Sequence, residues 1–430
     1  MKRIIILALA CSASLAILAK GDGESRSTKV NVEISASDEI RIQAKYTALT
    51  IETWNKNEVE IEATVRYDGK VTSKIQEFLD EFESRVNDNI RLSGGELFID
   101  TDLDLPNKVQ VGSKNVGINI SYGDELKIFY KIKSPGSNEY TISTSYEDVR
   151  LIGAFNKVDF TQYSGDLTAG SIKSGKMNLK YGSAEIEHLG TAEMEIYEQE
   201  ISVTSIIDIT INMKYSDVEF RSVEVMEAIS YESDIKIGKA IVLSGNYKYG
   251  DINITNSLDK AELTLYEVDI EAGTIGSLLL ENTKYSKFEI DRVGSITFRQ
   301  SYEDETVIGT VGSFKSTNSK YGNHTIDLLE SSFKLNAYED EVEINELAKS
   351  VTDIIVDGKY IELSIDSDGS SFILKSNVKY GNVEYNENLV DVKRYIKEGD
   401  NLEVEAVSKN TSDQPINILV TGYEVKVQLD

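Results

Sequence analysis

The chain has 430 residues, with 73 acidic side chains against 45 basic ones and a formal net charge of −28. A surface this acidic repels nucleic acids and anionic lipid head groups, which disfavours a nucleic-acid-binding or membrane-surface role. Two interpretations of the charge stay open: solubility with suppression of edge-to-edge aggregation, or binding of divalent cations.

The first residues have the layout of a secretory signal peptide. Lys2 and Arg3 precede an almost unbroken apolar run over residues 4–18, and a polar stretch follows. This run is too short and too early for a membrane-spanning helix, and no later stretch approaches the length that spanning needs. We therefore expect a signal peptide over residues 1–19, cleaved after its last residue, and a linker over residues 20–27.

Cys11 is the only cysteine. It follows Ala8-Leu9-Ala10, which loosely resembles a lipobox, so a lipoprotein anchored through Cys11 is an alternative to cleavage after Ala19. The apolar run continues past the cysteine, which favours ordinary cleavage. The mature chain would then contain no disulfide, no reactive thiol and no cysteine-ligated metal.

Strands and one helix are predicted after the linker. Alternating polar and apolar residues predict strands over residues 30–34, 40–45, 49–52 and 59–65. Apolar side chains at helical spacing predict an amphipathic helix, with Thr72 or Ser73 as its N-cap and an apolar face formed by Ile75, Phe78, Leu79, Phe82 and Val86. Stacked repeats need covered ends, so we expect residues 28–118 to form an N-terminal cap.

A tyrosine repeat dominates residues 119–388. The marker positions are Tyr122, Tyr146, Tyr163, Tyr181, Tyr197, Tyr215, Tyr231, Tyr249, Tyr266, Tyr285, Tyr302, Tyr321, Tyr338, Tyr360 and Tyr380. From Tyr146 to Tyr338 every interval is 16 to 19 residues. Lys-Tyr motifs alternate with Tyr-Glu motifs over much of this region, which gives a longer period of 34 to 36 residues. Such regularity indicates a repeat protein in which each interval is one rung.

The repeats are predicted to be strands rather than helical hairpins. Segments such as Glu341-Val342-Glu343-Ile344 alternate between polar and apolar residues, and β-branched residues and tyrosine are abundant. No proline occurs between Pro135 and Pro415, which fits continuous strand stacking. The predicted fold is therefore an all-β, single-chain β-solenoid (β-helix) with 16–19-residue rungs and a cap at each end.

The alternating motifs predict how charges and rings are arranged. We expect the lysines and glutamates to alternate along one column and so to relieve like-charge repulsion between rungs. Tyrosines of Lys-Tyr motifs are expected to face inward, and several of those in Tyr-Glu motifs outward. Two roles for the tyrosines stay open: a structural stack, which is favoured, or a surface on which carbohydrate stacks.

The tyrosine period is lost after residue 388. Strand patterns persist over residues 402–407 and 423–429. Residues 389–430 are therefore predicted to form a C-terminal cap.

The chain resembles the bacterial putative-adhesin family of envelope proteins with β-helical repeats. The resemblance rests on the opening strands around Thr53-Trp54-Asn55, the helix, the Lys133-Ser134-Pro135 segment, residues 146–149 and the many Tyr-Gly rungs. It covers roughly residues 30 to 390. It implies a location in the Gram-negative envelope or on the cell surface, and it supplies no catalytic residues.

No catalytic or cofactor site is predicted. The acidic pairs Glu147-Asp148, Glu303-Asp304 and Glu339-Asp340 look like equivalent repeat positions rather than the two carboxylates of a glycosidase. The longest spacings surround residues 351–368, which an irregular rung explains as well as an active site.

His188 and His324, the only histidines, are predicted to be exposed and to bind no metal. We therefore expect no catalytic, cofactor or metal residues and no cofactor, while the ligand-binding residues and the oligomeric state are left open.

The sequence thus favours a non-catalytic exported protein, an adhesin or binding scaffold at the cell surface, outside the cell or in the periplasm. Its partner would be a protein or a carbohydrate rather than a nucleic acid. Two alternatives stay open: a polysaccharide lyase or glycoside hydrolase on a β-helix, and a periplasmic scaffold linked to envelope stress.

Overall fold

The computed structural model describes residues 24–69, 71–103, 126–367, 369–410, 412 and 414–429. The predicted signal peptide, Cys11 and Tyr122 lie outside these residues. Within them the protein is all-β with a single helix, as predicted. The chain divides into two compact units, Met1–Ile207 and Asp208–Asp430.

The first unit begins with strands that run antiparallel. Strand β1 (Glu24–Glu33) pairs with β4 (Glu58–Tyr67), and β4 pairs with β7 (Leu126–Pro135). Because β1 already starts at Glu24, residues 24–27 belong to a strand and not to the predicted linker.

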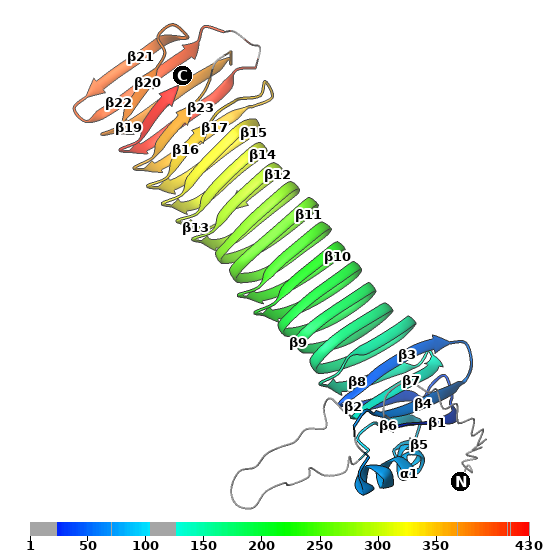
Figure 1. Ribbon diagram of the computed structural model, residues 1–430. Helices are drawn as coiled ribbons and strands as arrows, with labels where there is room; N and C mark the ends of the chain where they lie inside the picture. The colour runs from blue at the N-terminus through cyan, green and yellow to red at the C-terminus, as the bar shows by residue number, and fades with distance from the viewer. Residues whose placement is uncertain are drawn as a thin grey trace, which may run out of the picture. The chain divides into compact units, whose positions relative to one another are not determined.

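The predicted helix is confirmed as α1 (Ser73–Asp88). The Thr72 hydroxyl accepts a hydrogen bond from the Ile75 backbone N–H at 3.3 Å, which caps the helix. The apolar face is buried as predicted and contacts β1, β4 and β5 (Ile90–Ser93). The helix therefore covers these strands in the first unit (Figure 1).

The first complete rung comes from early in the chain. Strand β2 (Glu39–Lys45) pairs in parallel with β6 (Glu96–Asp100) on one side and β8 (Glu139–Ser145) on the other. Strand β3 (Thr47–Trp54) lies in the same way between β7 and the start of β9 (Val149–Lys214). Residues 39–54 thus form a rung inside the stack, although the sequence suggested that they belong to a cap.

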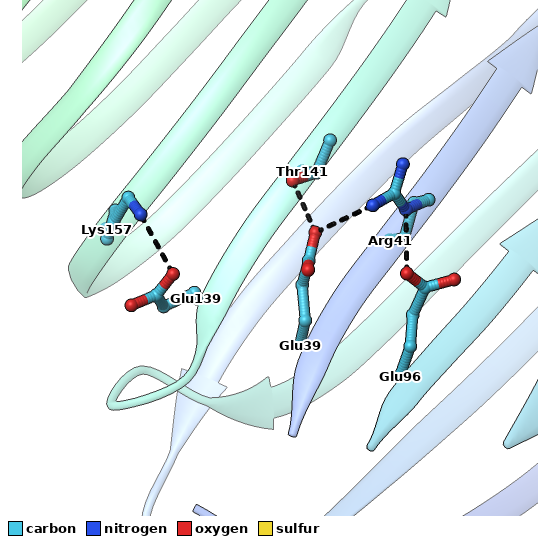
Figure 2. Close-up of polar contacts among 6 residues, drawn as sticks. All are labelled: Glu39, Arg41, Glu96, Glu139, Thr141 and Lys157. Carbon is cyan, nitrogen blue, oxygen red and sulfur yellow. Dashed lines mark hydrogen bonds and ion pairs between the residues drawn. The ribbon is translucent and has the colours of Figure 1, made fainter. Parts of the chain in front are cut away.

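An outward-facing column of acidic side chains crosses these rungs (Figure 2). Glu96, Glu39 and Glu139 are register partners on three adjacent strands. Arg41 pairs with the carboxylates of Glu96 at 3.1 Å and Glu39 at 3.3 Å, and Lys157 pairs with Glu139 at 2.9 Å. The two cations offset the like charges that this register brings together.

Strand β9 coils through several rungs, and bonds within it join residues 17 or 18 positions apart. The Asp166 N–H donates to the Asp148 carboxylate at 3.0 Å, and the Ser183 N–H donates to the Asp166 carboxylate at 3.2 Å.

The second unit continues with parallel strands in constant register, which Figure 1 shows as successive coils. Asp217 pairs with Asp234, 17 residues later, and Asp269 with Lys287, 18 residues later. The strands of this stack are β10 (Asp217–Tyr231), β11 (Asp234–Lys284), β12 (Lys287–Phe298), β13 (Ser301–Tyr302), β14 (Glu305–Lys320), β15 (Asn323–Tyr338) and β16 (Glu341–Ile344). Apolar side chains at alternate positions fill the interior, among them the fully buried Phe288, Phe298, Phe314 and Phe333.

The chain returns into the stack near its C-terminus. The remaining strands are β17 (Asp353–Lys359), β18 (Glu362–Ile365), β19 (Phe372–Lys379), β20 (Asn382–Tyr385), β21 (Val390–Glu398), β22 (Asn401–Ser408), β23 (Ile416–Tyr423) and β24 (Lys426–Leu429). Strand β23 lies between β17 and β19, and β24 lies between β18 and β20, all in parallel. Only β21 and β22 form an antiparallel hairpin beyond β19. The predicted cap over residues 389–430 therefore divides into a terminal hairpin and an internal rung.

Candidate functional site: the tyrosine edge

Each rung turns at one residue in the left-handed backbone conformation. In the first unit these residues are Tyr46, Tyr146, Ser164, Tyr181 and Glu198. In the second unit they are Tyr215, Glu232, Tyr249, Glu267, Tyr285, Glu303, Tyr321, Glu339, Tyr360, Glu424 and Tyr380. Left-handed backbone is unfavourable for L residues other than glycine, so each corner is a strained position that neighbouring contacts must stabilise.

The corner places two consecutive side chains on the outside. Around one corner, Tyr247 is buried, Lys248 and Tyr249 face outward, and Ile252 is buried again. The strict alternation of a strand is therefore shifted by one residue at every turn. In a Lys-Tyr motif the tyrosine is the corner residue, whereas in a Tyr-Glu motif the glutamate is.

This one-residue offset explains the uneven tyrosine intervals. From Tyr146 to Glu339 the corner residues themselves are always 17 or 18 positions apart. The prediction that tyrosines of Lys-Tyr motifs face inward was wrong: every marker tyrosine in the described residues is half-buried or exposed. The two classes of tyrosine differ in backbone conformation and not in the direction they face.

The rings contact one another along the edge. We call the series in the second unit the tyrosine ladder; in spatial order it consists of Tyr215, Tyr231, Tyr249, Tyr266, Tyr285, Tyr302, Tyr321, Tyr338, Tyr360, Tyr423 and Tyr380. Neighbouring ring centroids are 5.3 to 5.9 Å apart, and the rings meet edge to face. Each such contact stabilises by about 0.5–1.5 kcal/mol. The first unit has a shorter series from Tyr46 to Tyr197.

Charged side chains are interleaved with the rings differently from the prediction. Tyr302 is the register partner of Lys284 on one side and Lys320 on the other, so tyrosines separate the lysines. Glu303 is a corner residue and occupies the neighbouring column. The lysines and glutamates thus form two columns, each with like charges about two strand spacings apart, or ~9.6 Å. A hydrogen bond to Glu303 raises the pKa of Tyr302.

A column of amide side chains runs beside the ladder on the same face. On four successive rungs the residue two positions before the outward lysine or tyrosine carries an amide: Asn282, Gln300, Asn318 and Asn336. We call these four residues the amide column. Their side chains are half-buried or exposed, and none of the four amides has a hydrogen-bond partner within the described part of the chain. The sequence analysis did not single out any of them.

Two of the acidic pairs serve the backbone. The Asp304 carboxylate accepts from the Ser286 N–H at 2.9 Å, and the Asp340 carboxylate accepts from the Gly322 N–H at 3.0 Å. Asp304 also accepts from the hydroxyls of Thr283 and Ser301. Burial raises the pKa of the Asp304 carboxyl. These aspartates replace ladder bonds that the corners interrupt.

The third acidic pair is not equivalent to the other two. Tyr146 is itself the corner residue, so Glu147 occupies the place that Asp304 and Asp340 have in their rungs. Burial and the neighbouring Asp148 carboxylate raise the pKa of Glu147.

His324 is fully buried, so the prediction that it is exposed was wrong. Its ring lies 5.0 Å from the ring of Phe314, and its Nε2 lies 3.5 Å from Oδ2 of Asp340. A Cβ atom at Gly322 would come within about 3 Å of His324 Nε2, Ser319 Oγ and Asp340 Oδ2, so only glycine fits there. Among the described residues these three atoms have no hydrogen-bond partner.

His188 is exposed, as predicted, and its Nδ1 lies 2.8 Å from Ser205 Oγ. Across the described ranges, no group of three or more His, Cys, Asp or Glu side chains is arranged to hold a metal ion. No helix there is both long and apolar enough to cross a bilayer.

The irregular stretch after β16 remains part of the stack. Strands β17 and β18 pair in register with β15 and β16 before them and with β23 and β24 after them. The extra residues lie between β16 and β17, where the Thr352 N–H donates to the Ser331 carbonyl at 2.8 Å. This is the geometry of an irregular rung.

Comparison with known proteins gives few matches. No family model matches the chain, and no curated protein matches it. A structure described as a putative cell adhesion protein from Clostridium sporogenes is 11% identical, covers 95% of this chain and 100% of its own, and has a TM-score of 0.16. A putative lipid binding protein from Parabacteroides distasonis is 13% identical, covers 79% of this chain and 97% of its own, and has a TM-score of 0.17. Scores this low support no argument about this chain, so the family resemblance stays a prediction.

Proposed function

We propose that this protein is a non-catalytic, exported protein of the bacterial cell envelope that binds a partner through the tyrosine edge of a β-solenoid. The observation that carries the proposal is the tyrosine ladder, a continuous row of partly exposed aromatic rings in the second unit. Contiguous exposed aromatic surface is typical of interaction sites. Because the row repeats from rung to rung, it suits a long or repeated partner better than a single small molecule.

The arrangement of polar groups favours binding over catalysis. Ser319, His324 and Asp340 converge, as in hydrolases, but all three are buried and out of reach of a substrate. Asp304 and Asp340 are both engaged by backbone N–H groups. A β-helical polysaccharide lyase or hydrolase is therefore the weaker alternative.

Beads coated with the mature chain test the binding role. Retention on immobilised matrix proteins and glycans is compared with that of a variant carrying Tyr249→Asn, Tyr285→Asn, Tyr321→Asn and Tyr360→Asn. Asparagine tolerates the left-handed conformation of these corners. The matched control is Tyr395→Asn, which removes an exposed tyrosine outside the ladder. Loss of retention in the fourfold variant alone supports the proposal; equal retention of all three proteins contradicts it.

The envelope location is tested by protease treatment of intact cells that produce the full chain, with a periplasmic protein as control. Cleavage while the control survives supports a surface adhesin. Protection until the outer membrane is opened moves the proposal to a periplasmic binding scaffold.

A further inference from the structure

The amide column presents unused hydrogen-bonding groups at regular intervals. Each amide carries two N–H donors and a carbonyl acceptor, and in Asn282, Gln300, Asn318 and Asn336 all of these are free of partners in the described chain. Successive rungs are about 4.8 Å apart. The column therefore offers the same pair of functions, donor and acceptor, once per strand spacing. Sugar hydroxyl groups, which both donate and accept, are the complementary chemistry.

Aromatic rings accompany the amides on the same four rungs. Asn282 is followed by Tyr285, and Asn318 by Tyr321, and these two rings are 43% and 41% exposed. Only the buried Thr283 or Ser319 and an outward lysine lie between amide and ring. The apolar C–H face of a pyranose packs against an aromatic ring, so amide and ring together match the two faces of a sugar.

The charge of this face selects among sugars. On these four rungs the outward residues beside the rings are Lys284, Glu303, Lys320 and Glu339, so the charges balance. The chain as a whole carries −28 and repels polyanions. An uncharged ligand meets neither a local excess of charge nor long-range repulsion.

From these observations we propose that the amide column and the adjoining tyrosines bind an extended, uncharged polysaccharide that lies along the stack, with successive sugars on successive rungs. This inference rests on the proposed binding function and names its ligand class. A regular row of equivalent subsites predicts that affinity rises with the length of the glycan.

Titration calorimetry with the mature chain tests the inference. The probes are neutral linear β-glucan, xylan and mannan oligosaccharides of two to eight sugars, with oligogalacturonate as the anionic comparison. We expect binding of at least one neutral series, with affinity that grows with length and changes little with salt. The double variant Asn318→Ala/Asn336→Ala should bind at least tenfold more weakly, because each lost hydrogen bond weakens binding severalfold.

The matched control is Asn382→Ala, which removes an exposed amide outside the column that bonds to Glu384; it should bind like the original protein. Binding of oligogalacturonate alone, equal binding by the double variant, or no binding of any neutral series overturns the inference. In those cases tyrosine-dependent retention on matrix proteins would leave the proposed function intact. Loss of both results would end the proposed function as well.

Discussion

The corner residues show how an unfavourable backbone conformation is maintained at each turn. A left-handed L residue is disfavoured by about 1–2 kcal/mol, and one edge-to-face ring contact returns about 0.5–1.5 kcal/mol. Tyr285 contacts the rings of both Tyr266 and Tyr302. Strain and ring contacts are thus of similar size, and the tyrosine at a corner offsets the strain of its own position.

This balance predicts that glycine and alanine have opposite effects at the two classes of tyrosine. At the corner residue Tyr285 (φ 56°), Tyr285→Ala should destabilise more than Tyr285→Gly, by about 1 kcal/mol, because glycine relieves the strain. At Tyr302, which is not left-handed, Tyr302→Gly should be the more harmful change. Urea midpoints of the four variants measure the effect. The same order of midpoints at both positions would show that strain at the corner is unimportant.

The buried hydroxyl groups of two threonines lead to a second matched prediction. Thr306 Oγ1 is buried without a hydrogen-bond partner in the described residues, whereas Thr283 Oγ1 donates to Asp304. Thr306→Val should therefore leave the free energy of unfolding unchanged or raise it by up to about 1 kcal/mol, and Thr283→Val should lower it by about 1–3 kcal/mol. Thermal unfolding compares the two. A destabilising Thr306→Val would mean that the hydroxyl has a partner, such as an internal water molecule.

Sequence reasoning found the tyrosines but misjudged their direction, and the cause is physical. Tyrosine and glutamate are not residues that usually mark left-handed turns, so the shift in alternation at each corner was not expected. A signal existed in the constant spacing of the residues that follow Lys or Tyr in the two motifs. His324 had a signal too, because Asn323, His324, Thr325 and Ile326 alternate and place the histidine in phase with the buried isoleucine.

At the scale of strands, parallel in-register stacking brings like residues together. Asp217 and Asp234 are register partners, and the Asp251 N–H donates to the Asp234 carboxylate at 3.0 Å. Burial, followed by the charges of Asp234 and Asp269, raises the pKa of Asp251. The folded state therefore binds a proton at Asp251 more readily than the unfolded state does.

The sign of this shift predicts a pH-dependent effect of Asp251→Asn. A raised pKa in the folded state means that stability is lost as pH rises through that pKa, and is regained as pH falls towards the ordinary value of 3.8. The variant should be more stable than the original protein at pH 8, and the advantage should vanish near pH 4. Urea unfolding at both pH values measures it. A stabilisation that is independent of pH would rule out charge repulsion as its cause.

Strand positions were predictable, while the order of rungs in space was not. Residues 39–54 and 416–429 lie in the stack beside strands that are distant in the sequence, and local alternation contains no information about such neighbours. The motifs were nevertheless present. Lys45-Tyr46 and Tyr423-Glu424 repeat the two corner motifs, and each supplies a left-handed corner residue. The amide column was missed because asparagine on a strand was interpreted only as a polar outward residue.

For the molecule as a whole, the net charge of −28 opposes folding through self-repulsion. Only part of this charge is relieved by exposed ion pairs such as Lys236–Glu219 and Lys426–Glu362. Raising NaCl from 20 to about 150 mM shortens the screening length to about 8 Å and should raise the thermal midpoint. Differential scanning fluorimetry measures the change. A midpoint that falls with salt would mean that ion pairs outweigh repulsion in this protein.

The two inserted rungs have a mechanical consequence. Strand β3 lies between β7 and β9, and β23 lies between β17 and β19, so each terminal segment is hydrogen-bonded along both of its edges. A force applied to either end of the chain cannot peel off an outermost coil, as it could in a coil that simply ended. The force has to slide an enclosed strand past two neighbours, which loads many backbone bonds in shear at the same moment. A tether of this design withstands traction at its ends with no disulfide to lock it.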